Sequence, residues 1–152
     1  MTQRVDLATV MDRLAVDEVV SGYAAAVDDG DWAAYRALFT PDGRADYSSA
    51  GGVAGPAGEV ADWLARTMRL FPVRQHFIVN RRILLEDRDG DRDTARVLAD
   101  FLNPMRLAAD AGRDTAPHFV AGGRYTFALA RTSEGWRLSG VTVHEKWRQM
   151  RS

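Results

Sequence analysis

The sequence predicts an α+β fold in which three N-terminal helices pack on a curved, mostly antiparallel sheet. Two patterns carry this prediction. Before Pro72, apolar residues recur at three- and four-residue spacing in successive segments, as amphipathic helices require. After Pro72, apolar and polar residues alternate in runs that end at Gly- and Asp-containing turns, which is typical of consecutive strands. Helices followed by a series of strands favour separate layers over an alternating α/β architecture.

The N-terminal half is predicted to contain all the helices. Asp6 can cap the first helix and Gly30 can end it, and Asp31 can cap the helix that follows. The segment from 51 to 58 is rich in Gly and is expected to be a flexible loop. In order, we expect a helix at about 6–29, a helix at 31–39, a turn at 40–43, a short strand at 44–47, this loop, and a helix at about 58–70.

The C-terminal half is predicted to form strands near residues 75–87, 93–103, 117–131 and 135–147. Turn signals separate the first pair at 87–91 and the last pair at 132–135, whereas residues 107–117 form a longer polar connection. Helices on one face of a curved sheet leave an apolar hollow between the layers. A small hydrophobic molecule would bind in such a hollow.

Composition narrows the classes of function. A chain of 152 residues suggests a single domain, spanning 1–152, and 46% hydrophobic with 27% charged residues is ordinary for a globular protein. A net charge of −1 gives no reason to expect nucleic acid or an anionic membrane as partner. The N-terminus lacks the apolar region of a secretory signal, and no run is long enough to span a bilayer. The absence of Cys suits a reducing cytoplasm, where we expect the protein to act.

Metals and cofactors are not expected. The chain has only 3 histidines, which lie far apart and lack spaced carboxylate partners, and Cys-based zinc sites are excluded. The sequence also lacks the Gly patterns that bind nucleotides or dinucleotides. Any chemistry is therefore expected to use side chains alone.

His76, Asp28 and Tyr23 are the main candidates for that chemistry. Alternation places His76 on one strand face with Ile78 and Asn80, where it is either a general base or a buried histidine that serves packing. Asp28 lies at a helix C-terminus, where a carboxylate opposes the helix dipole, and such conflicts are expected at functional sites. Tyr23 lies on the apolar stripe of the same helix. A histidine oriented by a carboxylate, beside a tyrosine hydroxyl, can remove one proton and donate another.

Four further residues have two interpretations each. Asp100 interrupts an apolar strand: an inward carboxyl would have a raised pKa and could complete an oxyanion hole, whereas an outward one would pair with a neighbouring arginine. Tyr47 is either a core tyrosine or a contact to substrate. Arg124 and Arg131 lie on opposite strand faces, so either one could bind substrate or be surface charge.

Several short motifs in a consistent order resemble the SnoaL-like branch of the NTF2-like superfamily. The matching residues are Tyr23-x4-Asp28-x2-Asp31-Trp32, Leu38-Phe39-x-Pro41-Asp42-Gly43, Asp46-Tyr47, Gln75-His76, Gly122-Gly123-Arg124-Tyr125 and Gly135-Trp136. Together they cover about residues 7–147. The resemblance implies the cone of this superfamily, which hosts many chemistries.

The resemblance also implies roles for individual residues. Scytalone dehydratase has an Asp–His pair at positions that correspond to Asp28 and His76 and a pocket tyrosine at that of Tyr47, and lindane dehydrochlorinase is similar at the first two. Bile-acid 7α-dehydratases are similar at Tyr23, Asp28, His76 and Asp100, and ketosteroid isomerase at Tyr23 and Asp100. By this analogy His76, held by Asp28, is the base. Tyr23 and Asp100 would stabilise an enolate, and Tyr47 would assist.

These relatives imply a cofactor-independent dehydratase or isomerase that acts on an apolar, ring-containing carbonyl or phenolic compound, such as a polyketide or steroid. Asn80, Arg124 and Arg131 are the expected substrate contacts. The alternatives are a non-catalytic small-molecule-binding or dimerisation module and a polyketide cyclase. By analogy we also expect a homodimer or higher oligomer that pairs through the outer sheet face, with an interface formed by Trp136, Trp147, Tyr125 and Phe127.

Overall fold

The computed structural model describes residues 6–88, 91–108 and 115–151. In chain order its elements are α1 (Leu7–Asp29), α2 (Trp32–Ala37), β1 (Phe39–Asp46), the 3-10 turn η1 (Ser48–Ala50), β2 (Ala54–Pro56), α3 (Ala57–Thr67), the 3-10 turn η2 (Met68–Leu70), β3 (Val73–Arg74), β4 (Phe77–Arg88), β5 (Asp91–Arg106), β6 (Phe119–Thr132) and β7 (Gly135–Met150). Helices precede the long strands, which confirms the predicted α+β class.

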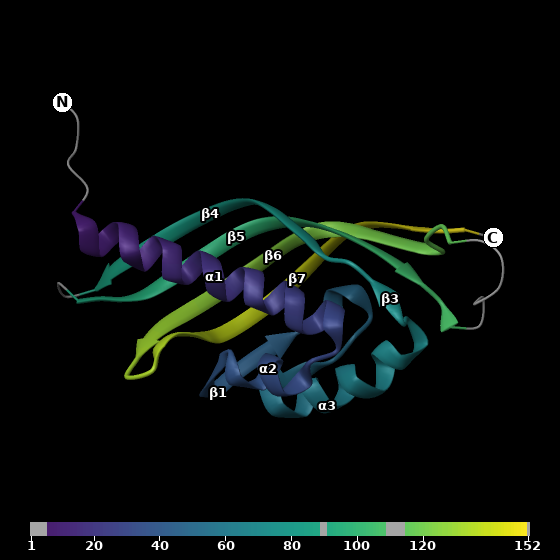
Figure 1. Ribbon diagram of the computed structural model, residues 1–152, viewed down its shortest axis with the longest axis horizontal. Helices are drawn as coiled ribbons and strands as arrows, with labels where there is room; N and C mark the ends of the chain where they lie inside the picture. Colours follow the sequence, from purple (N-terminus) through teal and green to yellow (C-terminus); the bar gives the residue numbers. More distant parts are fainter. Residues whose placement is uncertain (1–5, 89–90, 109–114, 152) are drawn as a thin grey trace.

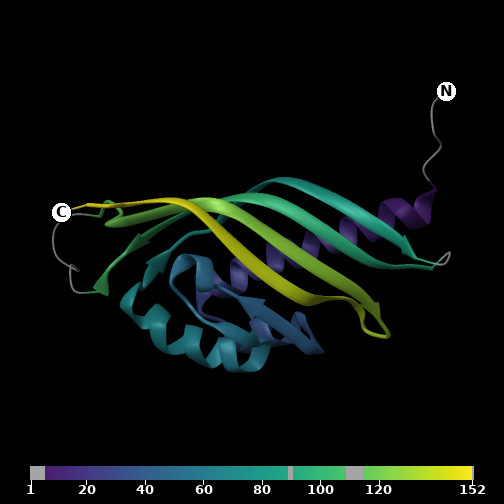
Figure 2. The same cartoon turned by 180° about the vertical axis from the view of Figure 1, so that it is seen from behind.

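The strands form a seven-stranded sheet in the order β2-β1-β7-β6-β5-β3, and β4 also pairs with β5. The pairing of β1 with β7 is parallel, and the other pairings are antiparallel. The two opposite views show that the sheet is curved and that the helices gather on one side of it (Figures 1 and 2). The predicted layers are therefore present.

Local signals in the sequence set the helix ends as predicted. The Asp6 carboxylate accepts a hydrogen bond of 2.8 Å from the backbone of Thr9. Gly30 ends α1 in the left-handed conformation, with φ of 66°, which glycine adopts without steric cost. Asp31 caps α2 by accepting a 3.0 Å bond from the backbone of Ala34.

Two segments differ from the prediction. Residues 40–43 were expected to be a turn but belong to β1, where the register against β7 shifts between Phe39 and Arg44. The Gly-rich segment contains β2, whose Ala54 pairs with Asp46 of β1. β1 pairs with the distant β7, and β2 pairs back onto β1 across η1, and local composition reveals neither pairing. Parts of the turn at 87–91 and of the connection at 107–117 lie outside the described residues.

The core lies between the helices and the inner sheet face. Tyr125, Phe127 and Trp136 are buried in it, with exposures of 4%, 0% and 4%. The prediction that these three form an oligomer interface was therefore wrong, because their strand parity points them toward the helices. Only Trp147 of that set is exposed. The oligomer itself stays a prediction.

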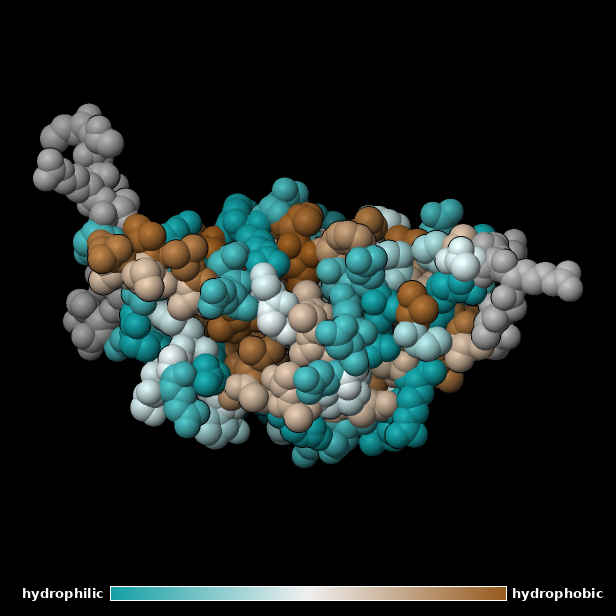
Figure 3. Space-filling model, in the orientation of Figure 1, coloured by the Kyte–Doolittle hydropathy of each residue, from teal (hydrophilic) through white to brown (hydrophobic). Residues whose placement is uncertain are grey.

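The N-terminal half of α1 lies outside this core. Figure 3 shows apolar side chains gathered over that part of the helix, and the exposed ones are Leu7, Val10, Met11 and Leu14. The buried stripe of α1 starts at Val16 and continues to Val27. In the part of the chain that the structure describes, no helix is both long and apolar enough to cross a membrane.

Candidate active site

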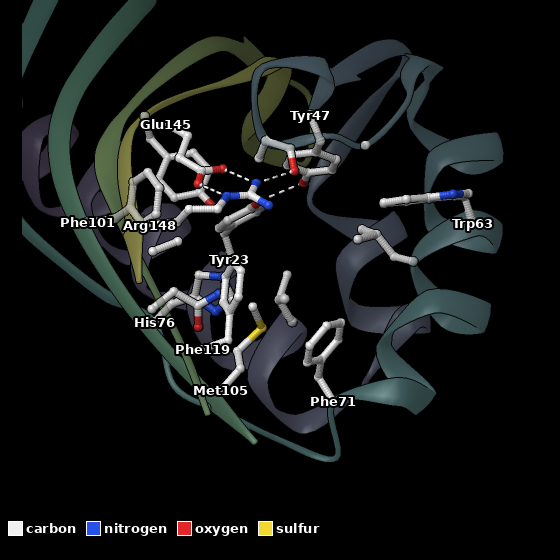
Figure 4. A pocket seen from close by; sticks show the side chains of 17 residues that line it. Tyr23, Tyr47, Trp63, Phe71, His76, Phe101, Met105, Phe119, Glu145 and Arg148 are labelled. Carbon is white, nitrogen blue, oxygen red and sulfur yellow. Dashed lines mark hydrogen bonds and ion pairs between the residues drawn. The ribbon is translucent and has the colours of Figure 1, made fainter. Parts of the chain in front are cut away.

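A cavity of about 220 Å³ lies where α1 and α3 face the inner side of β5, β6 and β7 (Figure 4). Most of its wall is apolar. The apolar side chains are Val27, Ala50, Trp63, Leu64, Phe71, Phe101, Met105, Phe119 and Ala121. The polar ones are Tyr23, Tyr47, His76, Asn103, Tyr125, Glu145 and Arg148. This is the apolar hollow, with a few polar groups, that the layered fold predicted.

The hollow exists because β6 presents small residues at its floor. Inward positions on β6 alternate as Phe119, Ala121, Gly123 and Tyr125, so two small residues lie between two aromatic ones. A Cβ on Gly123 would lie 2.1 Å from the backbone oxygen of His144, so no larger residue fits there without moving β7. The strand pairing therefore requires glycine at position 123, and Ala121 is the small residue that lines the cavity itself.

His76 and Asp28 meet at one end of the cavity. The His76 ring nitrogen Nδ1 lies 2.6 Å from Asp28 Oδ1, and the His76 backbone N–H lies 2.9 Å from Oδ2 and 3.1 Å from Oδ1. The imidazole is 7% exposed and the carboxylate 18%. Because an ionised carboxylate only accepts hydrogen bonds, the neutral imidazole in this contact has its ring hydrogen on Nδ1 and a lone pair on Nε2. The predicted contact between these two side chains is present.

Arg74 explains how Asp28 is tolerated at the C-terminus of α1. Its guanidinium Nε donates a 2.6 Å bond to the carbonyl of Val27, and its Nη1 donates a 2.9 Å bond to the carbonyl of Phe71. A cation at this helix end offsets the carboxylate. Burial lowers the pKa of Arg74, while Asp28 and Asp29 oppose that shift. Sequence analysis missed Arg74, although a basic residue two positions before His76 was a usable signal.

Three tyrosine hydroxyls form a hydrogen-bonded cluster near the His76–Asp28 pair. The hydroxyl of Tyr47 lies 2.6 Å from that of Tyr23 and 2.9 Å from that of Tyr35. Burial is the main cause that raises the pKa of all three, to about 12 for Tyr35. The phenols are therefore neutral near pH 7. A hydrogen bond with Tyr23 opposes the rise that burial causes in the pKa of Tyr125, so a fourth phenol joins this cluster. Tyr35 was not among the predicted residues.

Glu145 and Arg148 form the rim opposite His76. Arg148 donates to Glu145 through Nε at 2.5 Å and Nη2 at 2.7 Å, and Nη2 also donates to the carbonyl of Ala50 at 3.1 Å. Figure 4 shows the guanidinium between Glu145 and Tyr47. The Glu145 side chain is 7% exposed. A shift in the β6–β7 register between residues 145 and 147 brings Arg148 to the same inward face as Glu145, and simple alternation could not have predicted this.

Asp100 does not reach the cavity, so the prediction of an inward carboxyl was wrong. Its Oδ1 accepts a 3.1 Å bond from Arg124, and its Oδ2 accepts one of 3.1 Å from Asn80. The hydrogen bonds from Asn80 and then Arg124 lower the pKa of Asp100, opposite to the expected shift. The alternative, an exposed acid paired with an arginine, is the one that the structure shows.

The three expected substrate contacts also lie elsewhere. Asn80 has φ of 52°, and the β4–β5 register shifts between Val79 and Arg82, so Asn80 leaves the face of its strand that alternation predicted. Arg124 stays with Asp100 on the outer face. Arg131 pairs with Asp12 at 2.7 Å beside the β6–β7 turn. None of the three lines the cavity.

Asn103 is the buried polar residue that sequence analysis missed. It lines the cavity and is 7% exposed, and within the described residues its Oδ1 has no hydrogen-bond partner. Alternation along β5 places Asn103 on the same face as Val97 and Phe101, and this pattern could have identified it. Over those same residues, no group of three or more His, Cys, Asp or Glu side chains is placed to hold a metal ion.

Comparison with known proteins identifies the family. A family model described as the SnoaL-like domain matches residues 8–142. The chain belongs to the SnoaL-like family. Curated relatives include uncharacterised proteins of Mycobacterium tuberculosis and Mycobacterium bovis, each 30% identical over 132 residues, or 87% of this chain and 84% of theirs.

Solved structures show the same fold. The Kribbella flavida protein Kfla4162 aligns with a TM-score of 0.79 at 23% identity over 92% of this chain and 94% of that one. Hexachlorocyclohexane dehydrochlorinase LinA-type3 of Novosphingobium barchaimii aligns at 0.78 and 16% over 97% and 95%. A scytalone dehydratase-like protein of Novosphingobium aromaticivorans aligns at 0.75 and 15% over 94% and 89%. These likenesses show that the fold is the one that the resemblance implied, with helices on one face of a curved sheet.

Proposed function

We propose that this protein is a cofactor-independent lyase that eliminates water or another small leaving group from an apolar ring compound carrying a carbonyl oxygen. The observation that carries the proposal is the His76–Asp28 pair at the wall of an apolar cavity, with Nδ1 engaged and Nε2 left for a ligand. A base in this setting is oriented before the substrate arrives, which is a condition for efficient proton transfer.

The reaction balances with the side chains alone. Nε2 of His76 takes a proton from the carbon beside the carbonyl, and the electron pair of that C–H bond forms the double bond of an enolate. When the enolate collapses, the carbonyl re-forms, a double bond forms to the next carbon, and the bond from that carbon to its hydroxyl breaks. The proton on His76 passes to the departing oxygen, so water leaves and no other reactant is consumed.

The tyrosines support the reaction as donors. Because burial raises the pKa of Tyr23 and Tyr47, both keep their hydrogens and can stabilise negative charge on a substrate oxygen. Hydrogen bonds from these hydroxyls stabilise charge most strongly in a cavity that holds little water. Asp100 has no part in this proposal, since it lies on the outer face.

The size of the cavity favours small substrates. An engineered apolar cavity of about 150 Å³ accommodates benzene, so about 220 Å³ supports a substrate of one or two rings. The four rings of a steroid would extend beyond the rim. Two structural neighbours, a hexachlorocyclohexane dehydrochlorinase and a scytalone dehydratase-like protein, also support elimination from a ring.

The test uses 3-hydroxy-1-tetralone, a two-ring β-hydroxy ketone whose dehydration gives 1-naphthol and a change in ultraviolet absorbance. We expect turnover by the protein and a loss of about 100-fold or more in His76→Gln, since general-base catalysis contributes about 10²–10⁴. His144→Gln is the matched control, because His144 is exposed on β7. Its activity should not change.

A second readout does not depend on elimination. The C2 hydrogens of 1-tetralone should exchange with D₂O in the presence of the protein but not of His76→Gln, as followed by proton NMR. Equal hydrogen exchange or equal turnover in the wild type and His76→Gln would refute the role of His76 as the general base. Binding of 1-tetralone without either reaction would favour the non-catalytic binding module.

A further inference from the structure

One row of inward side chains crosses the cavity floor. Asn103 on β5 pairs with Ala121 on β6, and Ala121 pairs with Arg148 on β7. All three line the cavity. Because Ala121 is small, there is open space above it between the amide and the guanidinium.

The same row reaches the base. Phe77 pairs with Leu102, and the antiparallel register continues without a shift into the pairing of β3 with β5. His76 therefore lies opposite Asn103. Cβ atoms of directly opposed residues in antiparallel strands lie about 4.5–5.5 Å apart. A ligand group that touches the Asn103 amide is then only one or two bonds from a carbon that contacts His76.

An asparagine at position 103 would cost stability if its side chain served packing alone. Its side chain is 7% exposed, and its Oδ1 finds no partner among the described residues. Buried polar groups in proteins nearly always have a hydrogen-bond partner, and an exception needs an explanation. Leucine has a similar size and would avoid the unpaired group. The NH₂ group of the same amide is not among the buried unpaired atoms, and it can donate to a ligand in the cavity that Asn103 lines.

The geometry points to a role for Asn103 in substrate recognition. We propose that Asn103 binds the carbonyl oxygen on the carbon next to the one that His76 deprotonates, and holds that oxygen as it becomes an enolate. A carbonyl oxygen accepts hydrogen bonds, so the NH₂ group of Asn103 is the part of the amide that makes this contact. The site selects ketones of one or two rings over hydrocarbons of the same shape. This proposal rests on the proposed function for the enolate step, but not for binding.

The test compares two ligands that differ by one oxygen, 1-tetralone and tetralin. Dissociation constants of both are measured by NMR titration for the wild type, Asn103→Leu and Gln149→Leu. We expect the ratio of the two constants to shift about tenfold against the ketone in Asn103→Leu, as loss of a buried hydrogen bond requires. Gln149→Leu, an exposed amide on β7, should leave the ratio unchanged.

Stability separates recognition from a structural role. The melting temperature of Asn103→Leu should equal or exceed that of the wild type, because an apolar side chain replaces an unpaired amide. Asn103→Ala serves if the leucine variant does not fold. A ratio that stays within twofold in the folded variant overturns the proposal, and so does destabilisation without a shift in the ratio.

The outcomes also separate this inference from the proposed function. If Asn103→Leu shifts the ratio of dissociation constants but the wild type catalyses neither hydrogen exchange nor dehydration, the ketone site is supported and the proposed lyase activity is refuted. If Asn103→Leu dehydrates the substrate normally and the ratio is unchanged, the lyase activity is supported and the proposed role of Asn103 is refuted. In Ala121→Val, which fills the space beside the amide, affinity for both ligands should fall together.

Discussion

Replacing Asp28 by Asn should reverse the tautomer of His76. The carboxylate accepts from both the ring Nδ1 and the backbone N–H of His76. An amide of the same shape has only one oxygen. In its better orientation that oxygen accepts from the backbone N–H, and its NH₂ group then donates to Nδ1. The ring hydrogen must move to Nε2, where it blocks the lone pair that would take the substrate proton.

The expected losses follow from these contacts. Because the base is in the wrong tautomer, turnover should fall by about 10²–10⁴. Two hydrogen bonds to a charged acceptor become bonds between neutral groups, which costs about 1 kcal/mol each. The carboxylate is only 18% exposed, so solvent screening removes little of this. The free energy of unfolding should fall by about 2 kcal/mol, or about 4–8 °C in melting temperature.

Two measurements check this prediction. Nitrogen-15 NMR of the imidazole identifies which ring nitrogen carries hydrogen in the wild type and in Asp28→Asn, and urea denaturation gives the loss of stability. Asp29→Asn is the matched control, because none of the hydrogen bonds to His76 comes from the neighbouring acid. An Nε2 that remains unprotonated in Asp28→Asn would refute the account of how the base is oriented.

Three further predictions concern stability and can be measured by urea denaturation. Tyr47→Phe should lower the free energy of unfolding by about 2 kcal/mol, because two buried hydroxyls lose a shared partner; no loss would show that the cluster is not coupled. Burial raises the pKa of Tyr35 to about 12, so the unfolded chain loses this proton first, near pH 10. The stability from this group is thus complete below pH 10 and declines by on the order of 3 kcal/mol as the pH rises to 12, and Tyr35→Phe should flatten the decline. Gly123→Ala should cost about 3 kcal/mol or prevent folding, since its Cβ would lie 2.1 Å from a backbone oxygen. Gly58→Ala, whose Cβ meets nothing within 4 Å, should instead be neutral or stabilise α3 by up to about 1 kcal/mol; equal effects would contradict the packing argument.

The layers could be predicted because their signals are local or depend on regular spacing. Capping residues such as Asp6 and Gly30 act within one turn of their helix, and the structure has both helix ends as expected. The contact of Asp28 with His76 joins residues 48 positions apart, so it could be expected only from resemblance to a family.

The buried faces of the strands were harder to predict, because β5 carries apolar residues on both sides. Leu98 and Leu102 share the outer face with Asp100, while Phe101 and Asn103 face the core. When both faces contain apolar side chains, alternation shows which residues go together but not which set is buried. The inward role was therefore given to Asp100, and Asn103 was overlooked.

Residues beyond an irregular strand pairing could not be placed at all. Asn80 leaves its expected face because the backbone enters the left-handed region there. Arg148 follows an extra residue in β7, so counting by twos from Val143 predicts the wrong side. A bulge is a property of the pairing between two strands, and one strand's sequence does not specify it.

The extra residue in β7 affects how relatives should be compared. Glu145 and Arg148 are three positions apart, and both face the cavity only because the strand changes phase between them. A relative with the same two residues but a regular strand would turn one of them to solvent. Matching letters in an alignment would then suggest a shared rim where none exists. Comparisons within the family are better made by the face that each position occupies than by identity alone.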